Sequence, residues 1–99
     1  MAFKNTVIGV VATNAQLDVA QTNELAWAAH DGLARAVRPS HSLYDGDAIF
    51  GLSTGKVRAH QALVSDMAAE ATTLAILNAV LAAEKASGLP SARSWQPGR

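Results

Sequence analysis

Thr6 stands at the head of the most strand-like stretch of the chain, where a hydroxyl group could act as a nucleophile. The apolar run of residues 7–12 follows it directly and contains four β-branched side chains, which favours a buried strand over a helix. A threonine hydroxyl attacks well only if a base takes its proton, and a threonine that begins a chain can use its own α-amino group. That amine has a pKa of about 8. This chemistry requires cleavage between Asn5 and Thr6, whereas the plainer interpretation of the same residues is a central strand without chemistry.

Two carboxylates flank a glycine in the turn that precedes the second strand-like stretch. They are Asp45 and Asp47, on either side of Gly46, and a dipeptide of the Asp-Gly type is typical of a turn. A carboxylate such as Asp47 could orient the ammonium or hydroxyl group of Thr6.

The remaining pattern predicts the order strand, helix, strand, helix. We expect a helix from Asp18, an N-cap with Gln21 as its reciprocal partner, to Pro39. A second strand is expected over residues 47–54, ended by Gly55 and Lys56. A longer helix follows over residues 60–86, with Gly88 as its C′ residue.

Each expected helix has an apolar face. Residues four apart mark the core face of the first helix, namely Leu25, Ala29, Leu33 and Val37. Trp27 is expected to pack beside them, and Gly32 either admits a close neighbour or weakens the helix. In the second helix the stripe through Met67 is expected to be a core face; its other members are Leu63, Ala71, Leu74, Leu77 or Asn78, and Leu81. Because apolar residues also occur beside this stripe, we expect the helix to be covered on more than one side.

A strand–helix–strand unit in one sheet normally has parallel strands. Both strands then begin at the same edge of the sheet, so Thr6 and the turn at residues 45–47 are predicted to meet there. Two strands and two helices cannot cover both faces of a sheet, and the chain is therefore interpreted as α/β, one half of a layered sandwich. Residues 1–90 form this partial domain and residues 91–99 a tail that docks through Trp95.

Composition excludes several functions. Eight basic and eight acidic residues cancel, so no basic stripe for nucleic acid exists. His30, His41 and His60 lack metal-ligand spacing, and residues 51–57 depart from the phosphate-loop motif in both its spacing and its final hydroxyl. We therefore expect no metal and no cofactor. With no cysteine, no signal peptide and no long uninterrupted apolar run, we expect a cytoplasmic chain that does not enter a membrane.

The residues quoted above resemble one known family. The stretch 5–15 is similar to the start of the β-chain in the P1-type peptidases, peptidase family S58, which includes DmpA-like D-aminopeptidases and β-peptidyl aminopeptidases. The similarity continues through residues 30–39, His41, residues 45–47, residues 49–50 and residues 53–55. It covers most of residues 4–90 in the expected order.

The resemblance implies an αββα sandwich of the Ntn-hydrolase-like kind and a precursor that cleaves itself. Thr6 matches the nucleophile, Asn5 the residue left at the cut, and Asp45 and Asp47 the positions around the glycine, of which Asp47 is the stronger candidate. It also implies peptide or amino-acid amide substrates, an α-chain from the same precursor and a homo-oligomer of αβ units.

Two departures from the family pattern stand out. Val7 replaces a second hydroxyl residue after the nucleophile, and only residues 1–5 precede Thr6, where the family has a long α-chain with the oxyanion donors. We therefore expect the isolated chain to be unprocessed and inactive. The alternative is a non-catalytic remnant that serves only in packing or assembly.

Overall fold

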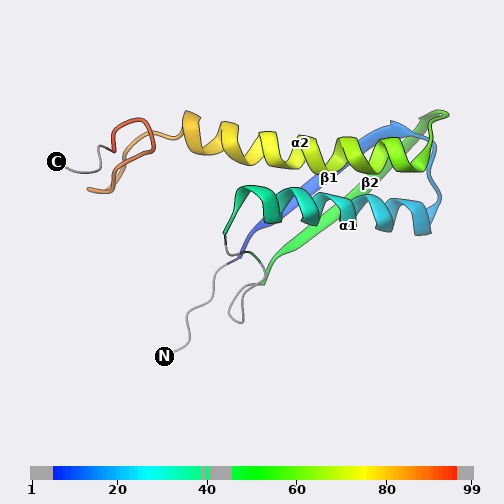
Figure 1. Ribbon diagram of the computed structural model, residues 1–99, viewed down its shortest axis with the longest axis horizontal. Coiled ribbons are helices and arrows are strands. Elements are labelled where there is room, and N and C mark those ends of the chain that lie inside the picture. The colour runs from blue at the N-terminus through cyan, green and yellow to red at the C-terminus, as the bar shows by residue number, and fades with distance from the viewer. Residues whose placement is uncertain (1–5, 39, 41–45, 96–99) are drawn as a thin grey trace.

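The computed structural model describes residues 6–38, 40 and 46–95, and these residues fold as two strand–helix units (Figure 1). The elements are β1 (Ile8–Ala15), α1 (Val19–Ala36), β2 (Ala48–Val57) and α2 (Gln61–Ala82). The predicted α/β class and element order are confirmed.

The two strands form one parallel sheet, as the connection between them predicts. Ile8 pairs with Ala48, and the register continues to Thr13 opposite Ser53 before it shifts. β2 does not end at Gly55. Because Gly55 has a φ of +72°, a conformation that glycine adopts without strain, the strand makes an irregular step there and Val57 pairs again with β1.

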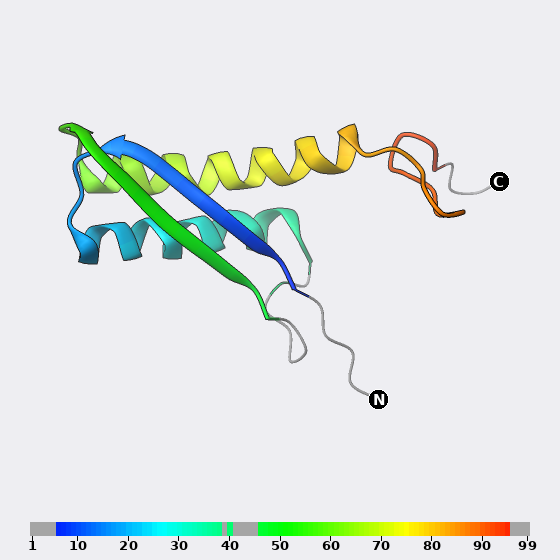
Figure 2. The same cartoon turned by 180° about the vertical axis from the view of Figure 1, so that it is seen from behind.

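Both helices lie on one face of this sheet and run side by side in the same direction (Figures 1 and 2). α1 begins as predicted. Oδ1 of Asp18 accepts a hydrogen bond from the backbone N–H of Gln21 at 2.8 Å, and Oε1 of Gln21 accepts one from the backbone N–H of Asp18 at 3.0 Å. This capping box satisfies two backbone donors that a helix start otherwise leaves open.

The core is small and consists of short and medium side chains. From α1 it takes the predicted residues Leu25, Ala29 and Leu33. The other buried apolar residues are Ala15, Val64, Ala68 and Ala69.

Glycine decides how closely α1 approaches its neighbours. A Cβ on Gly32 would overlap the carbonyl oxygen of Ala69 and lie 2.8 Å from Cβ of Thr72. The hydroxyl of Thr73 also donates to the carbonyl oxygen of Gly32 at 3.0 Å. Gly32 therefore admits a close neighbour rather than simply weakening the helix. On the other side, a Cβ on Gly51 would lie 2.5 Å from the carbonyl oxygen of Thr22.

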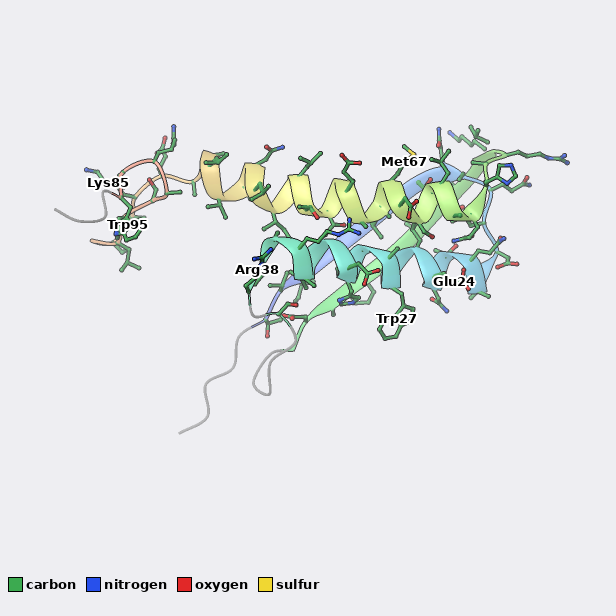
Figure 3. All side chains as sticks on the ribbon, viewed as in Figure 1. Glu24, Trp27, Arg38, Met67, Lys85 and Trp95 are labelled. Atoms are coloured by element: carbon green, nitrogen blue, oxygen red, sulfur yellow. The ribbon has the colours of Figure 1, made fainter. Side chains whose placement is uncertain are left out.

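The expected core face of α2 is wrong. The stripe through Met67 faces outward, and its large side chains are exposed, whereas Val64, Ala68 and Ala69 are buried. Figure 3 shows Met67 on the side of α2 that points away from α1. The reason is steric: the contact at Gly32 has room for alanine and threonine but not for leucine.

Two tryptophans also differ from expectation. Trp27 is 73% exposed and points away from α2, and Trp95 is 62% exposed in the tail (Figure 3). Neither indole packs into the core of the described part of the chain.

The end of α2 is earlier than predicted. The helix stops at Ala82 because Ala83 is extended, so Gly88 is not its C′ residue. Gly88 and Ser87 instead have positive φ values in a tight turn, in which Ala86 and Leu89 exchange two backbone hydrogen bonds.

By length and composition alone, α2 is long and apolar enough to cross a membrane. Only 17% of its apolar 18-residue segment is buried. The expectation that the chain does not enter a membrane rested on uninterrupted apolar runs, all of which are shorter than this helix. A single helix of this kind is weak grounds for a span, and Asp66 and Glu70 lie within it.

The second face of the sheet is uncovered in the described part of the chain. Ile8, Val10, Phe50 and Leu52 project from it and are between 53% and 72% exposed. Parallel sheets are almost always covered on both faces, so this surface has the character of an interior.

Replacing Gly32 with alanine tests the close helix approach. Although alanine is intrinsically better in a helix by about 1 kcal/mol, the overlap with backbone should lower the free energy of unfolding by about 1–3 kcal/mol. Urea denaturation of the full chain measures it. Gly9→Ala is the matched control, since its Cβ would meet Ile49 at an ordinary 3.7 Å. Equal stability of Gly32→Ala and the wild type would contradict the packing described here.

Candidate active site at the start of the strands

The candidate nucleophile lies in the open at the start of β1. Thr6 is exposed, and the backbone immediately after it is fixed by β2. The carbonyl oxygen of Val7 accepts a hydrogen bond from the backbone N–H of Ala48 at 2.8 Å. The main chain that follows the hydroxyl is therefore held by the sheet, while the side chain stays accessible.

Asp47, the residue directly before β2, contacts the same place. Its Oδ1 accepts a hydrogen bond from the backbone N–H of Val7 at 3.0 Å, across 40 residues of sequence. A hydrogen bond to an ionised carboxylate is stronger than one between neutral groups. The acidic group is thus bound to the backbone of the residue directly after Thr6.

Gly46 adjoins the hydroxyl itself. A Cβ placed on Gly46 would lie 3.3 Å from Oγ1 of Thr6, closer than most contacts of a Cβ. The backbone of Gly46 therefore lies close to the hydroxyl group of Thr6. Gly46 lies beside Thr6 and Asp47 is bound to Val7, as predicted for the turn at residues 45–47. That prediction rested on the parallel strand–helix–strand connection.

Two other candidates cannot be placed. Asn5, the residue before the proposed cut, and Asp45, the first carboxylate of the turn, lie outside the described residues, as does His41.

Two histidines, His30 and His60, lie among the described residues, and His30 lines a pocket together with Ala48 and Ile49 at the start of β2. His30 is on α1, with its ring centroid 5.8 Å from that of Trp27, and His60 is the N-cap residue of α2 without a side-chain capping bond. His60 is next to the end of β2, whereas Thr6 is next to the start of β1. Within residues 6–38, 40 and 46–95, no group of three or more His, Cys, Asp or Glu side chains could hold a metal ion.

Ser53 was not recognised from the sequence as a positioning residue. Its hydroxyl donates to the carbonyl oxygen of Ala15 at 2.6 Å and accepts from the backbone N–H of Leu17 at 3.3 Å. It joins the middle of β2 to the end of β1, where the ladder becomes irregular. Only the strand register reveals this role, because Ser53 is distant in sequence from both partners.

The arrangement has the parts of a hydrolytic site but not a complete one. An exposed hydroxyl, a backbone held on the adjacent residue and a carboxylate on the next strand suit attack by Thr6 on a carbonyl carbon. The amino group of Thr6 would be a base only after cleavage of the preceding peptide bond.

Comparison with known proteins gives consistent matches over nearly the whole chain. The family model described as peptidase family S58 matches residues 2–93. The chain is 42% identical over 109 residues to an uncharacterized aminopeptidase of Mycobacterium leprae, covering 95% of this chain and 30% of the relative. It is 38% identical to an uncharacterized aminopeptidase of Mycobacterium tuberculosis, covering 95% of this chain and 32% of the relative.

A third similarity is shorter. A 6-aminohexanoate-oligomer endohydrolase of Paenarthrobacter ureafaciens is 30% identical over 53 residues, which are 54% of this chain and 15% of that enzyme. The chain spans about a third of the length of the two aminopeptidases.

The bond from Val7 to Asp47 gives a local prediction. Asp47→Ala removes the acceptor, so the Val7 amide should exchange its hydrogen about tenfold faster or more, and the chain should lose about 1 kcal/mol of stability. Asp47→Asn retains a carbonyl acceptor and should show a smaller effect. Amide exchange followed by NMR measures both, with Asp31→Ala on the exposed side of α1 as control. An unchanged Val7 amide in Asp47→Ala would show that the carboxylate does not hold the start of β1.

Proposed function

The chain belongs to peptidase family S58, and we propose that it is the nucleophile-bearing part of an aminopeptidase, with Thr6 as the nucleophile. The observation that carries the proposal is the position of Thr6: an accessible hydroxyl directly before a strand whose backbone is held by Asp47. The aminopeptidase names of the two mycobacterial relatives support the reaction class.

The first step of the proposed chemistry is self-cleavage. Oγ1 of Thr6 attacks the carbonyl carbon of Asn5, the C–N bond breaks, and the proton of the hydroxyl passes to the amino group that is released. Water then hydrolyses the Asn5 ester. The products are a chain that ends in the carboxylate of Asn5 and a second chain that begins with the free amine and hydroxyl of Thr6.

The second step uses the new N-terminus on substrate. The α-amino group of Thr6 takes the proton of Oγ1 as the oxygen attacks the carbonyl of the first peptide bond in the substrate. The proton then passes to the leaving amine, and the N-terminal amino acid stays on Thr6 as an ester. Water releases it, so the substrate class is peptides and amino-acid amides.

Asp47 has a positioning role in this scheme. Because its carboxylate is bound to the residue after Thr6, it fixes the direction in which the hydroxyl and amine of Thr6 emerge from the strand. Its negative charge also favours the ammonium form that arises when the amine accepts a proton. We assign Asp45 a supporting role on the other side of Gly46.

The proposal includes a partner, the longer segment that the relatives have in addition to this region. We propose that this α-chain segment covers the open face of the sheet, completing an αββα sandwich, and that it brings the oxyanion donors. The exposed Val10, Phe50 and Leu52 side chains are the surface for it. Loss of one oxyanion donor typically lowers a rate by ~10²–10³, so we expect processing and hydrolysis to depend on this segment.

A non-catalytic role is the second candidate. The exposed apolar surface of the sheet would serve equally well if the chain only assembled with another protein. The two candidate functions predict different outcomes for the peptide bond between Asn5 and Thr6. A catalytic chain cleaves it, whereas a chain that serves only in assembly leaves it intact.

Intact-mass measurement decides between them. The full chain is co-expressed with the part of the Mycobacterium leprae relative that lies outside the matched region, and we expect a fragment that begins at Thr6 together with release of amino acids from peptide amides. Thr6→Ala should abolish both, and Thr6→Ser should retain cleavage.

Thr54→Ala is the matched control, because Thr54 is an exposed threonine on β2. It should be processed like the wild type. Complex formation without cleavage would favour the assembly role, and full hydrolytic activity of Thr6→Ala would remove Thr6 from the mechanism.

A further inference from the structure

An open pocket with a volume of about 300 Å³ lies between α1 and the start of β2. α1 contributes four residues and β2 contributes its first two; together they are Asn23, Ala26, Trp27, His30, Ala48 and Ile49. The four helical residues are three, one and three positions apart, a spacing that places them on one face of the helix. Figure 3 shows that Trp27 points away from α2, so the pocket is on the side of α1 that the helix pair leaves open.

The lining of the pocket suits a flat, uncharged aromatic group. The indole of Trp27 is 73% exposed, and the imidazole of His30 is tilted by 48° to it, with the ring centroids 5.8 Å apart. A third ring can enter the angle between these two by an edge-to-face or offset contact, the arrangements that aromatic groups prefer. The lining residues include no carboxylate to attract a cation, which favours a neutral ring over a basic side chain.

The outer edge of β2 adds backbone groups that suit a peptide. The backbone N–H of Ala48 donates to the carbonyl oxygen of Val7, so the backbone groups of Ala48 face β1. Successive residues of a strand direct these groups to opposite sides, and those of Ile49 therefore face away from β1, toward the pocket. Among the described residues the sheet has no third strand at this edge. Ile49 thus offers a donor and an acceptor of the kind used when a peptide binds along a sheet edge.

The pocket is within reach of a substrate bound at Thr6. Ile8 pairs with Ala48 and Thr6 is two residues before Ile8, so standard strand spacings put the Cα atoms of Thr6 and Ala48 about 8 Å apart. An extended peptide advances by about 3.3 Å per residue. If its first carbonyl carbon is at Oγ1 of Thr6, its second residue lies between Thr6 and the pocket. Gly46, which adjoins the hydroxyl, has no side chain to obstruct that path.

We propose that this pocket binds an aromatic side chain on the second residue of the peptide substrate, the residue directly after the bond that is cleaved. The inference rests on the proposed function, because only attack by Thr6 gives the distance to the pocket this meaning. Trp27 is the main contact, and its large exposure in the free chain is the exposure of a binding surface. The pocket adds a preference for the leaving group that Thr6 and Asp47 do not provide.

NMR titration of the full chain measures binding without any need for catalysis. Alanyl-phenylalanine amide should shift the indole N–H resonance of Trp27 and the backbone amide of Ile49 at millimolar concentrations. Alanyl-alanine amide should bind with a dissociation constant about tenfold higher or more, since it lacks the ring. The indole of Trp95, 62% exposed in the tail, is the internal control and should not move. Followed at Ile49, Trp27→Phe should keep the preference and Trp27→Ala should lose it.

Steady-state kinetics tests the same preference in the complex of the full chain with the part of the Mycobacterium leprae relative outside the matched region. Release of alanine from alanyl-phenylalanine amide should have a KM about tenfold lower than release from alanyl-alanine amide. Trp27→Ala should remove this difference, and Trp27→Phe should keep most of it. Trp95→Ala is the matched control and should keep it in full.

Three results would overturn the proposal. The first is equal binding of the two amides, or shifts confined to residues outside the pocket. The second is a KM preference that Trp27→Ala leaves unchanged, which would leave the proposed function standing. The third is loss of complex formation in Trp27→Ala, which would assign the pocket to the α-chain segment. Selective shifts at Trp27 and Ile49 with no hydrolysis of either amide by the complex would support the pocket and contradict the proposed function.

Discussion

The parallel pairing of β1 with β2 is the constraint on which the rest of the structure depends. In a parallel pair both strands start at the same edge, and here that edge unites two segments 40 residues apart through the bond from Val7 to Asp47. No side-chain interaction local in sequence could place Asp47 beside the residue that follows Thr6. An antiparallel pairing of the same strands would have moved Asp47 to the far end of β1. The candidate site thus depends on the connection through α1, whose length and direction allow the parallel arrangement.

The second constraint is the close approach of backbones at two glycines. Gly51 lets α1 rest on β2, and Gly32 lets α1 meet α2, so that the helix is held between a strand and a helix by contacts that leave no room for a Cβ. Such contacts favour small residues on both partners. As a consequence, the small side chains of α2 face inward and its large ones face outward. The core is therefore modest, and much of the apolar content of this chain remains at the surface.

The two exposed apolar surfaces differ in shape and so in what can cover them. The sheet face presents β-branched and aromatic groups on alternating positions of two strands, a pleated surface suited to another sheet at about 10 Å. The outward side of α2 presents leucine and methionine at helical spacing, and it is separate from the sheet face.

Features that depend on local chemistry and on chain topology could be predicted from the residues alone. The capping box at Asp18 and the buried face with Leu25 and Leu33 follow from residue types at fixed spacing, and the meeting of Thr6 with the turn before β2 follows from the crossover rule. The buried side of α2 could not be predicted from the sequence. Apolar residues occur on nearly all sides of that helix, so their spacing does not show which side faces the core. The shape of the groove at Gly32 made the choice in favour of alanine. β2 continues past Gly55 for a similar reason. Glycine normally marks the end of a strand in the sequence, but here pairing of Val57 with β1 holds the strand together beyond it.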